Sequence, residues 1–253
     1  RILTSDRRPV TQGEIQAGML LEVTLGTAKR VYTFQQPYIS AMKEITVDGR
    51  AGAEEAVDFR AETVWETDDT DAHEIEIDLG KKYVLTELKV NWANADGASA
   101  YTVETSIDGR IWNPVVDRSG NTIAVGEAQD ELQSYGRYVK LCIAEGSTPS
   151  ISEIEVYGWM VSVKDGEDRI FVSETERTIC VPTDVAEFHT GGTLSGGMNF
   201  ENIAPLIVVD GNCQAAHEND TDYSLDENHS LFNVTDTLGR KVPFRFKFFT
   251  GGN

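Results

Sequence analysis

Residues 101–112 read YTVETSIDGRIW, in which apolar and polar side chains alternate before a short turn signal. Alternation with a period of two over Tyr101–Thr105 predicts a half-buried antiparallel strand, because successive side chains of a strand point to opposite faces. In the turn that follows, Asp108 can bond back to the chain and Gly109 can take the positive-φ position. The stretch therefore predicts a β-hairpin, with Trp112 closing over one end of a core.

The same alternation recurs on both sides of this hairpin. It occurs in residues 74–79 (EIEIDL), 85–90 (LTELKV) and 151–157 (ISEIEVY). Turn signals separate these segments, among them Leu79-Gly80-Lys81. Many short strands with frequent turns predict an all-β protein built on a β-sandwich. A single short turn of helix is expected, within residues 51–57.

The composition excludes several classes of partner. The chain has 253 residues, of which 42 are acidic and 22 basic, so its formal net charge is -20. Nucleic acids are bound through a basic face that neutralises phosphates, so no nucleic-acid partner is expected. Anionic membrane surfaces are disfavoured for the same reason. No apolar run approaches the roughly 18 residues that span a bilayer, so direct membrane insertion is not expected.

The three cysteines are widely spaced, at Cys142, Cys180 and Cys213. They form no C-x-x-C pair, so a structural zinc site is not expected. An odd number leaves at least one free thiol, and the pairing of the other two stays open. The sequence begins at Arg1 without a signal peptide, which we interpret as a mature or trimmed piece of a longer polypeptide.

Three regions of the chain differ in character. Residues 1–44 are the least acidic and hold two expected strands, which are too few for a core of their own and should pack on a neighbouring domain. Residues 45–158 carry the cleanest strand pattern. Residues 159–253 restart the alternation and end in a run that places Phe244, Phe246 and Phe248 on one face. We predict a second, smaller C-terminal β-domain of unknown family there.

Four segments of residues 45–158 match the pattern of one family, in order and at the usual spacing. They are Ala56–Trp65 (A-V-D…T-V-W), Ile75–Gly80 (IEIDLG), Trp92–Trp112 with the hairpin above, and Gly136–Gly158 with its closing strand. These residues resemble the discoidin domain, also called the coagulation factor 5/8 C-type domain, whose bacterial branch includes the family 32 carbohydrate-binding modules. The resemblance implies a discoidin-like, galactose-binding-domain-like jelly-roll β-sandwich that presents its binding loops at one end of a rigid scaffold.

The resemblance also implies a structural Ca²⁺ in the first loop. Its ligands would be the carboxylates of Asp58 and Glu153, oxygens of Thr63 and the carbonyl of Arg60, and a hard cation takes six to eight such oxygens. The sequence departs from the family at two positions, because Phe59 replaces the usual Gly and Arg60 the usual Asn or Asp. The alternative is that Asp58 only caps a turn and that Glu153 is a solvated strand residue.

The family's sugar sites lie on loops near the calcium end. Carried over to this chain, the candidate carbohydrate-binding residues are Glu66, Asp68, Trp92 and Asn94. Sugars are recognised by an aromatic platform together with carboxylate and amide hydrogen bonds. The alternatives are that Trp92 is buried on its strand and that residues 66–71 form a solvated acidic loop. His73 is expected to be a structural histidine.

No catalytic motif stands out. Ser195 lies in GGTLSGG, which fails the G-x-S-x-G pattern, and neither H-E-x-x-H nor a P-loop is present. The sequence therefore predicts a non-catalytic, secreted or cell-surface bacterial protein that binds a glycan or glycoprotein, or the accessory region of a larger glycan-processing protein. The alternative is a structural spacer or adhesin-like interaction module without sugar binding. An enzyme would need a site in residues 159–253, and the oligomeric state stays open.

Overall fold

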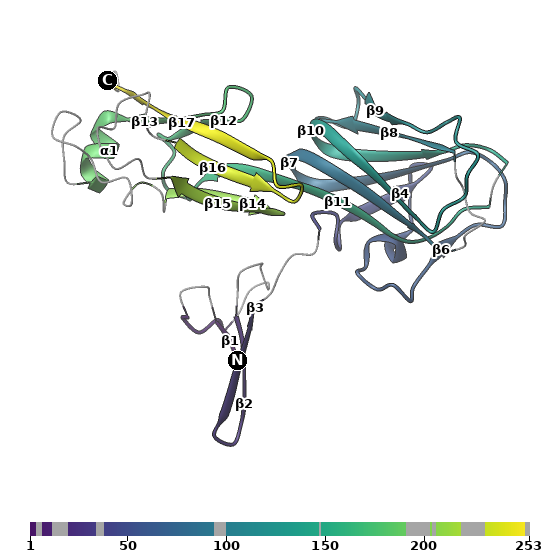
Figure 1. Cartoon of the computed structure of the whole chain (residues 1–253), viewed down its shortest axis with the longest axis horizontal. Helices are drawn as coiled ribbons and strands as arrows, with labels where there is room; N and C mark the ends of the chain where they lie inside the picture. Colours follow the sequence, from purple (N-terminus) through teal and green to yellow (C-terminus); the bar gives the residue numbers. More distant parts are fainter. Residues whose placement is uncertain are drawn as a thin grey trace.

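The structure is a computed structural model and describes residues 1–3, 7–11, 20–33, 38–93, 100–146, 148–190, 203, 206–218 and 231–250 (Figure 1). Its elements, in chain order, are β1 (Ile2–Leu3), β2 (Leu20–Leu25), β3 (Ala28–Thr33), β4 (Glu44–Val47), β5 (Arg50–Ala51), the 3-10 helix η1 (Glu54–Val57), β6 (Trp65–Glu66), β7 (His73–Trp92), β8 (Tyr101–Ser106), β9 (Asn113–Asp117), β10 (Glu127–Ile143), β11 (Ser150–Val163), β12 (Phe171–Ser173), β13 (Thr178–Pro182), α1 (Thr183–Thr190), β14 (Ile207–Gly211), β15 (Cys213–Glu218), β16 (Leu231–Asp236) and β17 (Lys241–Phe249). Among the helices in these ranges, none combines the length and the apolar character that a membrane crossing requires.

The 20-residue strand β7 organises the central domain. Its first half pairs with β4, its second half pairs with β11, and β10 follows it along both halves. The two halves belong to the two layers of a sandwich, and they meet where the β7–β10 register shifts between Asp78 and Tyr83. Both halves bury their apolar residues in one core: Ile75, Ile77, Leu79, Leu85, Leu88 and Val90. The prediction of an all-β, discoidin-like jelly-roll sandwich is confirmed.

The predicted turn at Leu79-Gly80-Lys81 is wrong. Gly80 adopts a φ of 79° inside β7, and its N–H donates to Oδ1 of Asp78 at 2.8 Å. The local twist therefore redirects the strand from one layer to the other without ending it. The sequence suggests two separate strands here, and the structure has one continuous strand.

The hairpin of β8 and β9 follows the sequence prediction at its turn. Gly109 has a φ of 71°, and Oδ1 of Asp108 accepts hydrogen bonds from the N–H groups of Arg110 and Ile111 at 2.9 and 3.1 Å. The expectation for Trp112 is wrong. Its ring lies on the outer face of β10, with its centroid 4.2 Å from the Nζ atom of Lys140, and packs beside Tyr138.

A second core belongs to the C-terminal residues. The five-stranded sheet has the order β12-β13-β17-β16-β15, with β13 and β17 parallel. Phe244 and Phe246 are almost fully buried on one face of β17, as the sequence predicts, and the ring of Trp159 packs against Phe244 with centroids 5.9 Å apart. The helix α1 was not predicted. The C-terminal residues are thus mostly β-structure around a core of their own, while the predicted domain boundary at residue 159 falls inside β11.

The strand β11 joins the two cores. Its residues between Ile151 and Trp159 pair with β7, and its last five residues pair with β14 from the C-terminal half. Gly158 and Gly211 sit where these strands meet: a Cβ atom at Gly158 would lie 2.6 Å from the carbonyl oxygen of Val84, and one at Gly211 would lie 2.2 Å from the carbonyl oxygen of Gly158. Two glycines thus permit the close backbone approach that fuses the two β-structures.

The N-terminal strands β1, β2 and β3 form a separate three-stranded sheet, which lies apart from the sandwich and the C-terminal sheet in Figure 1. Residues 38–44, at the end of the predicted N-terminal region, pack on the central domain instead. Ile39 is fully buried, and its N–H donates to the carbonyl of Val156 at 2.8 Å. Ser40 both donates to the carbonyl of Ile154 and accepts from the N–H of Val156, each at 2.8 Å.

Candidate functional site

The first loop gathers oxygen atoms from three predicted metal ligands. Oδ1 of Asp58 accepts the N–H of Arg60 at 2.9 Å, which fixes the turn after η1. The Thr63 hydroxyl lies 2.9 Å from each Asp58 carboxylate oxygen and 2.8 Å from the carbonyl oxygen of Arg60. A hydroxyl has one proton to donate, so three acceptor oxygens around it leave lone pairs uncompensated at this point.

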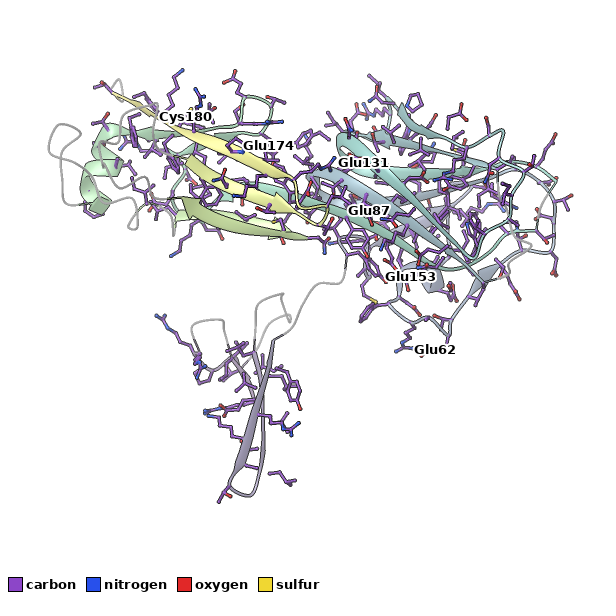
Figure 2. The ribbon with its side chains drawn as sticks, in the orientation of Figure 1. Glu62, Glu87, Glu131, Glu153, Glu174 and Cys180 are labelled. Carbon is purple, nitrogen blue, oxygen red and sulfur yellow. The ribbon has the colours of Figure 1, made fainter. Side chains whose placement is uncertain are left out.

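Glu153 reaches the same loop from β11, because η1 packs on that strand. The β11–β7 register shifts between Ile151 and Glu153, so the alternation breaks and Glu153 is 6% exposed. Figure 2 shows it on the side of the domain from which the first loop, marked by Glu62, projects. The alternative that Glu153 is a solvated strand residue is wrong.

The Glu153 carboxylate is short of compensating partners. Its Oε1 atom is buried and has no hydrogen-bond partner in the described part of the chain, while the Tyr38 hydroxyl and the Phe59 amide face the group. Burial is the main cause that raises the pKa of Glu153, and the negative charge of Asp58 adds to it. A cation between the two carboxylates would offset both the cost of burying the Glu153 charge and its repulsion from Asp58.

These residues offer only oxygen ligands, the kind that Ca²⁺ takes. Within the described ranges, no three His, Cys, Asp or Glu side chains converge on one point, so an ion here would need neutral oxygens as well as the carboxylates of Asp58 and Glu153. The Thr63 hydroxyl and the Arg60 carbonyl supply oxygens of that kind, which suits a hard cation. Phe59 adopts a φ of 61°, a left-handed conformation that favours glycine, which is the residue the family usually has at this position. Its ring is 63% exposed.

A polar pocket of about 490 Å³ opens beside this loop, at the end of the sandwich. Its walls come from β6, the acidic loop and the start of β11, and include Val64, Glu66, Asp68, Ala93, Thr148 and Ser150. Backbone hydrogen bonds hold the walls together, from Thr67 N–H to the Pro149 carbonyl at 3.3 Å and from Ala93 N–H to the Ser150 carbonyl at 2.8 Å. We call this the end-loop pocket.

The structure brings together two of the four predicted carbohydrate-binding residues. Glu66 and Asp68 are exposed at the end-loop pocket. Trp92 is only 5% exposed, because its ring packs in the core with its centroid 6.0 Å from that of Tyr101, so its prediction as a binding residue is wrong. Asn94 lies outside the described residues.

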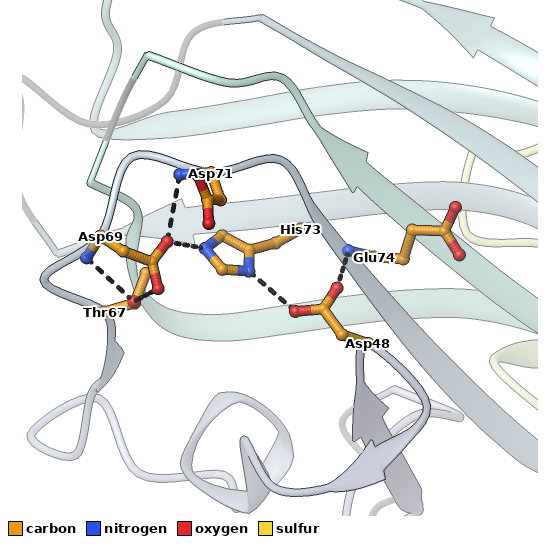
Figure 3. A network of polar contacts seen from close by, with 6 residues as sticks. All are labelled: Asp48, Thr67, Asp69, Asp71, His73 and Glu74. Carbon is orange, nitrogen blue, oxygen red and sulfur yellow. Dashed lines mark hydrogen bonds and ion pairs between the residues drawn. The ribbon is translucent and has the colours of Figure 1, made fainter.

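A charged network behind the acidic loop was not predicted from the sequence (Figure 3). Nδ1 of His73 lies 3.0 Å from Oδ2 of Asp48, and Nε2 lies 2.8 Å from Oδ1 of Asp69. Asp69 also accepts the N–H of Asp71 at 3.1 Å, and the Trp65 ring packs edge-on against the imidazole with centroids 6.0 Å apart. The imidazole thus ties the acidic loop to the β4–β5 turn, and the Asp-x-x-x-His spacing is the one sequence signal for it.

The protonated form of His73 is the one that satisfies both neighbours, because a neutral imidazole has only one N–H to donate. Burial acts to lower the pKa of His73, but the carboxylates of Asp48 and Asp69 outweigh it and raise the pKa above its ordinary value. Burial acts to raise the pKa of the Asp48 carboxyl, but hydrogen bonds from the Glu74 N–H and from His73 outweigh it and lower that pKa.

A comparison with protein families places the central domain. The family model described as F5/8 type C domain matches residues 39–155. Residues 39–155 are an F5/8 type C, or discoidin, domain. The match begins before the boundary predicted at residue 45 and includes the buried Ile39 and Ser40.

Several solved structures are similar to part of the chain. Chitosan-binding module 1 from a chitosanase/glucanase of Paenibacillus sp. IK-5 is 26% identical, with 49% of this chain and 100% of that one covered and a TM-score of 0.43. A carbohydrate-binding module of Clostridium perfringens, solved in complex with GalNAc-β-1,3-galactose, is 21% identical, with 45% and 93% covered and a TM-score of 0.40. A search of the curated proteins found no match.

Proposed function

We propose that the F5/8 type C domain binds carbohydrate at the end-loop pocket, as a non-catalytic module of a secreted or cell-surface bacterial protein that processes glycans. The observation that carries the proposal is the pocket itself: a concave polar site at the loop end of the sandwich, where Glu66 and Asp68 are exposed on either side of Thr67 in the sequence. The family match over residues 39–155 supports it, because carbohydrate-binding modules are one branch of that family.

The pocket's chemistry selects the class of glycan. Carboxylates accept hydrogen bonds from sugar hydroxyls, and charge-assisted bonds of this kind are stronger than neutral ones. Asp69 and Asp71 add negative charge on the same loop, in a chain of net charge -20. We therefore expect neutral glycans and glycans with free amino groups to bind, and sialylated or sulfated glycans to be repelled.

Calcium supports the pocket in this proposal. Asp58, Glu153, the Thr63 hydroxyl and the Arg60 carbonyl would hold the ion, which supplies positive charge between two carboxylates. The first loop would then be fixed to β11, and the same two elements carry Val64 and Ser150 into the wall of the pocket. The ion's role is structural, because the end-loop pocket lies beside the loop and needs no reactive group.

A glycan array tests the proposal. The recombinant chain is applied with Ca²⁺ to neutral, amino, sialylated and sulfated glycans, beside the double variant Glu66→Gln/Asp68→Asn. Binding to neutral or amino glycans that the double variant loses would support the site. A matched control, Asp165→Asn/Glu176→Gln, removes two acidic charges from the C-terminal domain and should bind as the natural chain does. Silence on every glycan class would overturn the proposal.

The second candidate is a rigid spacer or adhesin-like interaction module. It is favoured by β11, one uninterrupted strand that belongs to both sheets, and by the residues that line the end-loop pocket, which within the described ranges include no aromatic ring. This candidate expects a silent array together with a scattering profile of one rigid, elongated particle.

A further inference from the structure

One face of the N-terminal sheet is covered. Leu3 and Glu22 lie on this face and are only 3% and 8% exposed. Ion pairs join Glu22 to Arg1, with Nε and Oε1 2.7 Å apart, and to Lys29. The one acidic side chain that the structure describes in this sheet is therefore already compensated.

The opposite face of the sheet is apolar and exposed. Val23 is 47% exposed, Leu25 84% and Tyr32 51%, and in Figure 1 the sheet stands away from the rest of the protein. The strand β1 adds only two residues to the β2–β3 hairpin, and a hairpin without a packing partner is marginally stable in water. Contiguous exposed apolar residues of this kind mark a protein–protein contact. We call this surface the hairpin face, and the register places on it Ile2, Leu21, Val23, Leu25, Arg30 and Tyr32.

Arg30 gives the hairpin face a positive charge. It lies opposite Val23 in the β2–β3 ladder. Of the residues that the structure describes up to Thr33, five are basic and only Glu22 is acidic, in a chain whose net charge is -20. Two hairpin faces packed on each other would bring their Arg30 side chains together, whereas an acidic surface would neutralise this charge. The rest of the chain is strongly acidic, so a second copy offers such a surface.

The layer of the sandwich that contains β4, β7, β10 and β8 has an acidic outer face. Four residues cross it in register, one on each strand: Thr46, Glu76, Lys140 and Glu104. Their neighbours along each strand point into the sandwich, so these four side chains point outward. The Nζ atom of Lys140 lies 3.1 Å from Oε2 of Glu74, and within the described ranges neither Glu76 nor Glu104 forms an ion pair. We call this surface the acidic face.

The acidic face suits a partner that is both basic and apolar. Burial raises the pKa of Glu76, and neighbouring carboxylates on the same strand add to this shift against the opposing charge of Lys140. A cation placed over Glu76 would offset these costs. Beside the row, the rings of Trp112 and Tyr138 pack together with centroids 6.5 Å apart and provide an apolar surface.

We propose that the hairpin face of one copy of this chain docks on the acidic face of a second copy. Arg30 then supplies the cation that Glu76 and Glu104 lack, and the apolar residues of the hairpin pack against Trp112 and Tyr138. Face-to-face packing of two sheets is the ordinary way in which β-structures bury such surfaces. Two different surfaces meet, so the contact is heterologous. It involves no residue of the end-loop pocket.

Sedimentation equilibrium of the full chain tests the association. In about 50 mM salt, we expect the weight-average mass to rise with protein concentration from 27.9 kDa to at least twice that value. In about 500 mM salt the association should weaken at least about tenfold, because salt screens the charges of the two surfaces. A chain that stays at 27.9 kDa up to about 1 mM in low salt would overturn the proposal.

Two valines on opposite faces of the hairpin form a matched pair of variants. Val23 lies on the hairpin face and Val31 on the covered side, and their exposed fractions are similar, 47% and 42%. Threonine keeps the shape and the strand propensity of valine in both. We expect Val23→Thr to weaken self-association about threefold and Val31→Thr to leave it unchanged. Equal effects of the two variants would contradict the assignment of the hairpin face.

Charge reversal tests the two surfaces against each other. Arg30→Glu and Glu104→Arg should each weaken self-association at least about tenfold, because each places like charges in contact. An equimolar mixture of the two variants should associate again, since the reversed charges attract. Glu176→Arg, on the C-terminal sheet, is the matched control and should associate as the natural chain does. Association that survives Glu104→Arg would overturn the proposal, and this variant leaves the hairpin itself unchanged.

Discussion

The Nε2 atom of His73 lies 2.8 Å from Oδ1 of Asp69, four residues earlier in the chain, and this contact fastens the acidic loop of the end-loop pocket to the sandwich. On its other side the imidazole meets Asp48 in the β4–β5 turn. The loop that carries Asp68 is therefore positioned by a charge that the physiological pH range can remove.

Stability should fall as the pH rises through the pKa of His73. That pKa is raised above 6.5 in the folded chain, so its contribution is complete below about pH 6.5 and is lost above the folded value. The lowered pKa values of Asp48 and Asp69 act at the other end, where their contribution is lost as the pH falls below 3.8. Between about pH 6 and 8.5 we expect a decrease in melting temperature of about 2 °C that His73→Gln abolishes. An equal decrease in His73→Gln would contradict this role.

Calcium should raise the melting temperature. An ion at roughly a hundred times its dissociation constant stabilises the folded state by about 2.7 kcal/mol, which is about 5 °C for a chain of this size. Scanning calorimetry in millimolar Ca²⁺ and in EGTA measures the difference.

The variant Asp58→Asn isolates the ion's contribution. An asparagine side-chain oxygen can still accept the N–H of Arg60, so the turn is kept while one ligand charge is lost. In EGTA it should be at least as stable as the natural chain, because the repulsion on Glu153 is relieved. In Ca²⁺ it should lose the shift. A natural chain with the same melting temperature in both buffers would rule out the metal site.

The strand alternation predicted where the core residues lie but could not predict how far each strand runs. Ile75, Ile77 and Leu79 alternate as expected, and so do the residues after residue 84. The local sequence around Gly80 is the same whether the strand ends there or continues from one layer into the other. The strand continues because both of its halves pair with β10. That pairing is non-local, so no short window of sequence contains it.

The candidate site divides in the same way. The proposed metal ligands Asp58, Thr63 and Glu153 could be named from a family pattern, although 90 residues of chain separate Thr63 from Glu153. Asp48 could not be named from the sequence, because its approach to His73 depends on β4 pairing with the start of β7. Trp92 was wrongly predicted to bind sugar, because a large aromatic ring beside a polar loop suggests a sugar platform. In the structure this ring packs in the core instead.

The cysteines should titrate as three free thiols. None forms a disulfide in the structure, and burial raises the pKa of the Cys213 thiol to about 12. Burial also raises the pKa of Cys142. Because the thiolate is the reactive form, we expect slow reaction of both with Ellman's reagent at about pH 8 in the native chain. In denaturant the reagent should find three thiols per chain without a reductant, and a count of one would indicate a disulfide.

Replacing Gly211 should weaken the junction of the two β-structures. Its φ is 101°, and a Cβ atom would lie 2.2 Å from the backbone oxygen of Gly158, which cannot rotate away. We expect Gly211→Ala to lower the free energy of unfolding by about 2–4 kcal/mol, from strain and from loss of β11–β14 pairing together. Chemical denaturation followed by tryptophan fluorescence measures it, since Trp159 lies beside the substituted position in the ladder.

The matched control for this substitution is Gly239→Ala. Gly239 also has a positive φ, 76°, but no atom lies within 4 Å of the added Cβ position. Its cost should be about 1 kcal/mol, the backbone contribution alone. The difference between the two variants therefore measures the close approach of β11 and β14. Equal costs would mean that the glycine pair is not what allows one strand to serve both sheets.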